Sequence, residues 1–212
     1  MVKLNESEII SKIIEHEWKM FQDVNAGGPR AACQSDYRTF AAMRGSQFSA
    51  WSGVAQKSYL SDLDTAASQS RNLVREKYIR MMQSTDPVGY AAFSKDIEEP
   101  SASKLALARS INKKLLAQAA VISAQYPSVA SHGRPLYSTD DGYDDTSIET
   151  YQLGELLTYS ENTLSALDSC ISELEKEGKS LVHMIVLNTM RHNGYADLKQ
   201  AEDAARNEVC HA

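Results

Sequence analysis

The sequence predicts an all-α protein, a single helical bundle of six or seven helices spanning residues 1–212. Three observations favour this class. Apolar residues recur at helical spacing along most of the chain, and no segment alternates as a strand does. Helix-capping residues precede several of these segments. The hydrophobic content of 42% is ordinary for a globular protein with one core.

Two capping boxes, Asn5 with Glu8 and Thr146 with Glu149, mark helix starts. The longest expected loop, residues 128–145, contains two glycines, a proline and four aspartates, as lids and binding loops often do. Residues 84–100 are expected to be irregular or a short helix. The expected helices cover residues 5–24, 36–51, 53–83, 101–125, 146–176, 180–192 and 197–209.

The composition excludes several classes of protein. A formal net charge of −6 without a basic run argues against nucleic-acid binding, because phosphate contacts need clustered Lys and Arg. No apolar stretch is long enough to span a membrane, and the first residues lack the pattern of a secretory signal. Cys33, Cys170 and Cys210 are widely spaced, which indicates reduced thiols in a cytoplasmic protein. The sequence leaves the oligomeric state and any cofactor open.

Two ionisable residues of opposite sign fall on apolar helix stripes. Glu17 lies within the stripe of the first helix, and Arg44, with Gln47 beside it, lies within that of the second. A buried charge without a partner costs several kcal/mol, so each needs a counter-charge. One interpretation is a structural Arg44–Glu17 pair. The other is a polar pocket in which Arg44 holds a substrate carboxylate and Glu17 acts as acid or base.

The expected helix over 146–176 carries a second polar set. Tyr151, Glu155 and Tyr159 recur at helical spacing on the face opposite a leucine stripe. This face is either exposed or half-covered, or it lines a pocket. In the glycine-containing loop before the second helix, Arg30 is expected as a further anion contact. Cys33 in that loop is either a buried, inert cysteine or a thiol whose pKa the helix N-terminus lowers.

Four segments share motifs with known proteins: residues 15–21 (EHEWKMF), 32–36 (ACQSD), 43–51 (MRGSQFSAW) and 149–161 (ETYQLGELLTYSE). Together they resemble the microbial family catalogued as domain of unknown function 4125, over nearly the whole chain. Pro29 departs from the family's pattern. The resemblance implies no particular activity. It implies that these residues occupy motif positions: Glu17, Cys33, Gln34, Asp36, Arg44, Gln47, Trp51, Tyr151, Glu155 and Tyr159.

These residues lead us to expect a small intracellular enzyme that uses acid/base chemistry on a carboxylate-bearing metabolite, such as an amino acid derivative or an organic acid. The expected catalytic residues are Glu17, Glu155, Tyr159 and Cys33. No metal ligands are assigned, but the sequence leaves open a metal held by carboxylates, and lyase, isomerase and hydrolase chemistry all fit. The alternative is a non-catalytic helical binding or interaction protein. The expected substrate contacts are Arg30, Gln34, Asp36, Arg44, Gln47, Trp51 and Tyr151.

Overall fold

The computed structural model describes residues 4–24, 31–142 and 145–209, and every regular element in these ranges is a helix. The all-α class is therefore confirmed, but six or seven helices is an undercount. The described chain has three short 3-10 helices, η1 (Ala32–Ser35), η2 (Ser94–Asp96) and η3 (Ser138–Asp140). It has eleven α-helices: α1 (Glu6–Gln22), α2 (Tyr37–Phe48), α3 (Gly53–Ser68), α4 (Leu73–Thr85), α5 (Pro87–Phe93), α6 (Ala102–Gln125), α7 (Pro127–Ala130), α8 (Ile148–Leu156), α9 (Glu161–Lys176), α10 (Leu181–His192) and α11 (Leu198–Val209).

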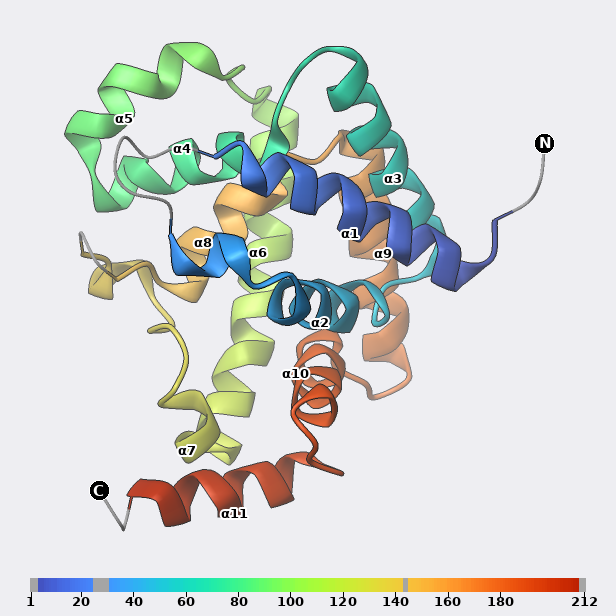
Figure 1. Ribbon diagram of the computed structural model, residues 1–212, viewed down its shortest axis with the longest axis vertical. Coiled ribbons are helices and arrows are strands. Elements are labelled where there is room, and N and C mark those ends of the chain that lie inside the picture. The colour runs from blue at the N-terminus through green and yellow to red at the C-terminus, as the bar shows by residue number, and fades with distance from the viewer. Residues whose placement is uncertain (1–3, 25–30, 143–144, 210–212) are drawn as a thin grey trace.

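The long helix α6 runs through the middle of the molecule (Figure 1). It packs against α7, α8, α9 and α10. On the near side of the view, α1 crosses the structure and contacts α2, α3 and α4, while α4 also packs against α8. The helices α1, α2, α4 and α8, far apart in sequence, therefore meet in one region.

The capping residues explain where the first helices begin. The side chain of Asn5 accepts a hydrogen bond from the backbone N–H of Glu8, and the Glu8 carboxylate accepts one from the backbone N–H of Asn5. This confirms the first predicted capping box. Asp36 caps α2 by accepting from the N–H of Thr39, and Ser101 caps α6 in the same way. Each cap satisfies an N–H that has no partner inside its helix.

The predicted helix over 53–83 is wrong in one respect, because it is two helices, α3 and α4. The chain turns at Ser70, whose φ of 56° is left-handed. Asn72 then caps α4, and its side-chain amide also donates to the carbonyl oxygen of Met20 on α1. This contact fixes α4 against α1, so a polar turn in the sequence is also a tertiary contact.

The predicted helix over 146–176 is also two helices, α8 and α9, separated by residues 157–160. Ser147, and not Thr146, caps α8, while the carboxylate of Glu149 accepts from the backbone N–H of Ser138. The predicted capping box at Thr146 and Glu149 is therefore wrong. Ser160 caps α9. The break lets α8 lie against α4 while α9 packs against α3 and α6.

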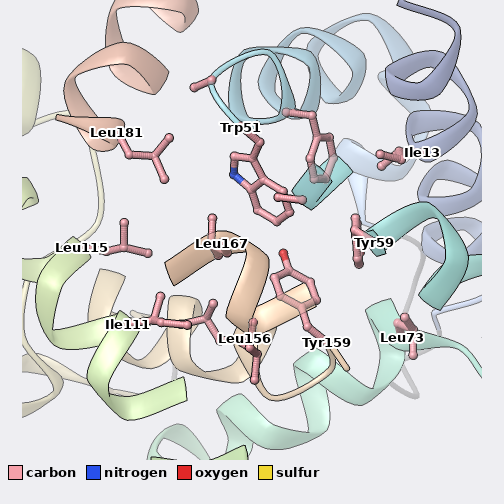
Figure 2. Close-up of a cluster of buried hydrophobic side chains, with 14 of the residues drawn as sticks. Ile13, Trp51, Tyr59, Leu73, Ile111, Leu115, Leu156, Tyr159, Leu167 and Leu181 are labelled. Atoms are coloured by element: carbon pink, nitrogen blue, oxygen red, sulfur yellow. The ribbon is translucent and has the colours of Figure 1, made fainter. Parts of the chain in front are cut away.

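The core contains large apolar side chains from several helices (Figure 2). Trp51 belongs to it, with its ring centroid 5.1 Å from that of Phe48, 6.0 Å from Tyr59 and 5.8 Å from Tyr159. Edge and tilted arrangements of this kind are those that aromatic pairs prefer. Within the described ranges, no helix combines the length and the apolar character needed to cross a membrane.

Candidate functional site

An open pocket of about 270 Å³ lies where α1, α2, α4 and α8 approach η1. Its wall combines apolar and aromatic side chains with two carboxylates and two cations. Three of the charged residues, Glu17, Arg44 and Lys77, are buried, so the pocket exposes only small parts of them. The lining residues are Glu17, Phe21, Cys33, Asp36, Thr39, Phe40, Met43, Arg44, Val74, Lys77, Tyr78 and Tyr151.

Arg44 and Glu17 form a two-pronged ion pair between α2 and α1. Arg44 Nε donates to Glu17 Oε2 over 2.6 Å, and Arg44 Nη2 donates to Glu17 Oε1. The hydroxyl of Tyr59 on α3 donates to the same Oε1 over 2.7 Å. The structure thus contains the pair that the helix stripes suggested, and it also contains a pocket beside that pair.

The guanidinium of Arg44 also holds Glu155 on α8. Arg44 Nη2 lies 3.0 Å from Glu155 Oε1, and Nη1 lies 3.4 Å from Oε2. Gln47 accepts from Nη1 over 2.8 Å and donates to Glu155 Oε1 over 3.0 Å, and the Tyr159 hydroxyl donates to that oxygen over 2.6 Å. With the two bonds to Glu17, all five N–H groups of Arg44 are used.

Lys77 on α4 completes the network. Its ammonium donates to Glu155 Oε2 over 3.4 Å and to the hydroxyl of Tyr151 over 2.8 Å. It also lies 4.3 Å from the centroid of the Tyr151 ring, and the guanidinium of Arg134 lies 4.7 Å from that ring. Close packing brings the helices together: a Cβ at Gly154 would lie 3.2 Å from the Lys77 carbonyl oxygen. The buried network therefore pairs two cations with two carboxylates.

Sequence reasoning missed Lys77 and Tyr59. Lys77 lies four residues from the buried Leu73 and four from the buried Met81, so it occupies the apolar stripe of α4. Tyr59 lies in the buried stripe of α3. The stripe argument that identified Glu17 also applies to both residues.

The network fixes the charge of its members near neutral pH. Burial disfavours the charged form of Glu155, but the positive charges of Arg44 and Lys77 outweigh burial and hold the pKa of Glu155 well below its ordinary value. Burial also disfavours a charged Lys77, yet Tyr151 and Glu155 outweigh it and raise the pKa of Lys77. Glu155 is therefore ionised and Lys77 protonated, which makes Glu155 a weak base and Lys77 a lasting positive charge.

Two tyrosines of the network, Tyr59 and Tyr159, stay protonated for the same physical reasons. Burial is the main cause that raises the pKa of Tyr159 and of Tyr59, and the neighbouring carboxylates raise it further. Both hydroxyls therefore act as hydrogen-bond donors, to Glu155 and to Glu17 respectively. They position the carboxylates and do not exchange protons with them near neutral pH.

The expected Tyr151–Glu155–Tyr159 face does not exist as a helix surface. Because α8 ends at Leu156, Tyr159 lies on the connection to α9. Glu155 is 7% exposed and Tyr159 is 1% exposed. An exposed or half-covered face at these two residues is therefore wrong, and they offer no surface to a protein partner. Of the three, Tyr151 lines the pocket.

The other predicted site residues lie in different places. Cys33, which is exposed, and Asp36 line the pocket. Gln34 is buried, and its side chain donates to the carbonyl oxygens of Phe21 and Val24, so it secures the end of α1. Trp51 packs in the core and is not part of the pocket wall. Arg30 lies outside the described residues.

The geometry limits what each group can do. Arg44 can hold a ligand carboxylate only by releasing Glu17, Gln47 or Glu155, because its donors are all used. Lys77 has three N–H groups and uses two in the bonds described above, and Glu17 uses three of about four acceptor positions. Both therefore have capacity left at the pocket. Across the described residues, no group of three or more His, Cys, Asp and Glu side chains is placed to hold a metal ion.

Fold and site together define an all-α protein with a charge-balanced buried network behind a small open pocket. A family model matches residues 7–203, and the chain belongs to that family, which is described as a protein of unknown function (DUF4125). The match confirms the resemblance seen in the sequence motifs. No curated protein and no solved structure matches the chain.

Proposed function

We propose that this protein binds a small carboxylate-bearing molecule in the pocket between α1, α2, α4 and α8, with Lys77 as the contact for the carboxylate. One observation carries the proposal: Lys77 is a buried, protonated residue that lines an open pocket. Its ammonium makes two hydrogen bonds among the described residues, so one of its three N–H groups has no hydrogen-bond acceptor there. A carboxylate in the pocket supplies that partner.

The rest of the wall supports a small ligand with an apolar part. Phe21, Phe40 and Tyr78 line the pocket, and the rings of Phe21 and Phe40 are stacked with centroids 5.5 Å apart. Small-molecule sites are mainly apolar with a few placed polar groups, and they commonly measure about 300–1,000 Å³. At about 270 Å³ this pocket lies just below that range, so it fits only a small ligand.

In this proposal Arg44 is a positioning residue and does not grip the ligand. Its bonds hold Glu17, Gln47 and Glu155 in place, and Glu155 in turn accepts from Lys77. The expectation that Arg44 holds the carboxylate is therefore replaced by one in which Lys77 does. Both cations are needed: Arg44 holds the neighbouring side chains in position, and Lys77 binds the ligand.

An acid/base enzyme is the second candidate function, favoured by Glu17. Its carboxylate lines the pocket, whereas Glu155 lies behind Arg44 and has a lowered pKa. Glu17 would take a proton from a carbon of the bound molecule. NMR in D₂O checks this: ligand C–H signals that exchange with the wild-type protein, and not with Glu17→Gln, support catalysis, and absence of exchange opposes it.

Ligand profiling tests the binding proposal. The wild-type protein and Lys77→Met are incubated with a metabolite extract, and bound species are identified by mass spectrometry. We expect small carboxylates to be enriched on the wild type and absent from Lys77→Met. The matched control is Lys19→Met, which removes an exposed lysine of α1 outside the pocket and should bind like the wild type. Equal recovery from all three proteins would show that Lys77 is not the contact.

A further inference from the structure

The charged groups on the pocket wall balance each other. The pocket is lined by Glu17 and Asp36, which are acidic, and by Arg44 and Lys77, which are basic. The N–H of Thr39 lowers the pKa of Asp36, so this side chain is ionised near neutral pH. A wall of this kind does not favour a ligand with a large net charge of either sign. It favours a neutral molecule, or one whose own charges are opposite and separated.

Two residues that line the same pocket have unused hydrogen-bonding capacity, one as a donor and one as an acceptor. The ammonium of Lys77 has one N–H that donates no hydrogen bond, and the carboxylate of Glu17 has about one unused acceptor position. Both are buried, Glu17 at 2% and Lys77 at 7% exposure, so a hydrogen bond from either to a ligand forms where water competes little. A ligand with one anionic and one cationic group satisfies both.

The apolar lining adds a third requirement. Phe21, Phe40, Met43 and Val74 present hydrocarbon to the pocket, and Tyr78 presents a half-buried ring. A ligand that carries charge alone leaves these surfaces in contact with water. A ligand with an apolar group covers them, and removing apolar area from water favours binding.

We infer that the ligand is an α-amino acid with an apolar side chain, bound as the zwitterion. Its carboxylate accepts a hydrogen bond from Lys77, and its ammonium donates one to Glu17. Its side chain lies against the apolar and aromatic side chains that line the pocket. This inference rests on the proposed function, because it keeps Lys77 as the carboxylate contact. It adds Glu17 as the contact for the amino group.

Matched ligand sets test the zwitterion on the unaltered protein, so no variant has to fold. Titration calorimetry compares L-phenylalanine with 3-phenylpropionate, which lacks the amino group, and with 2-phenylethylamine, which lacks the carboxylate. A second set compares L-leucine with 4-methylpentanoate and 3-methylbutylamine. We expect one of the amino acids to bind at least tenfold more tightly than either of its analogues. L-Aspartate, with a charged side chain, should bind more weakly than that amino acid.

The outcomes separate the inference from the function on which it rests. If the deaminated acid binds as tightly as its parent amino acid, or more tightly, the zwitterion is wrong and the carboxylate-binding proposal stands. If only the amines bind, both are wrong. If no compound of either set binds, the inference is overturned, and profiling with the metabolite extract decides the carboxylate proposal by itself.

Discussion

Replacing Arg44 with methionine is expected to lower the free energy of unfolding by about 3–5 kcal/mol at neutral pH. The Arg44 side chain is 11% exposed and pairs with two carboxylates whose side chains are 3% and 9% exposed. Methionine fills a similar space but leaves Glu17 and Glu155 as buried charges with only Lys77 to balance them. An uncompensated buried charge is among the few causes of so large a loss.

Chemical denaturation with urea measures this loss. Arg38→Met on the same helix is the matched control, because Arg38 is exposed, and the change should stay within about 0.5 kcal/mol. Adding Glu17→Gln to Arg44→Met removes one of the stranded carboxylates, so the double variant should recover part of the loss. A loss below about 1 kcal/mol for Arg44→Met would show that the carboxylates do not depend on this guanidinium.

Replacing Glu155 with glutamine is expected to lower the free energy of unfolding by about 3 kcal/mol at pH 7. The network then keeps both cations, Arg44 and Lys77, but only one carboxylate, Glu17. The cost should depend on pH. The folded-state pKa of Glu155 lies below its ordinary value of about 4.3, so the stability that its charge supplies is complete above that value. That stability is lost as the pH falls toward the folded-state pKa.

The difference between the wild type and Glu155→Gln should therefore shrink by about 1–2 kcal/mol between pH 7 and pH 3. Urea unfolding at pH 7, 5 and 3 measures it. Glu173→Gln, at an exposed position of α9, should show a small difference that changes little with pH. A difference for Glu155→Gln that stays constant from pH 7 to pH 3 would mean that the charge of Glu155 is not what stabilises the fold.

Local signals in the sequence predict much of this fold. The capping box at Asn5 and Glu8, and the Tyr126-Pro127 stop, define ends of α1 and α6 through interactions between residues close in sequence. The break after α8 is different, because Leu157 and Tyr159 are compatible with a helix. That connection is held by distant contacts: the N–H of Ser160 donates to Asp62 on α3, and Tyr159 packs against Tyr59 with ring centroids 4.6 Å apart.

The site, like the fold, could be predicted only where the signal lies within one helix. A charged residue on an apolar stripe, as at Glu17 and Arg44, indicates a buried pair from one helix alone. That Arg44 also binds Glu155, from a helix over a hundred residues later, depends on how the fold places α8 relative to α2. The spacing of Tyr151 and Glu155 marked α8 as unusual, but a helix pattern does not show what covers a face.

Carboxylate binding through Lys77 is tested by the melting temperature of the folded protein. Small carboxylates are added in increasing concentration to the wild type, Lys77→Met and Lys19→Met, and each shift is measured against the same protein without ligand. At least one carboxylate should raise the melting temperature of the wild type and of Lys19→Met, with a gain that grows with concentration, as binding to the folded state requires. Lys77→Met should show almost none of that gain. An equal gain in Lys77→Met, or no gain in any of the three proteins, would contradict carboxylate binding through Lys77.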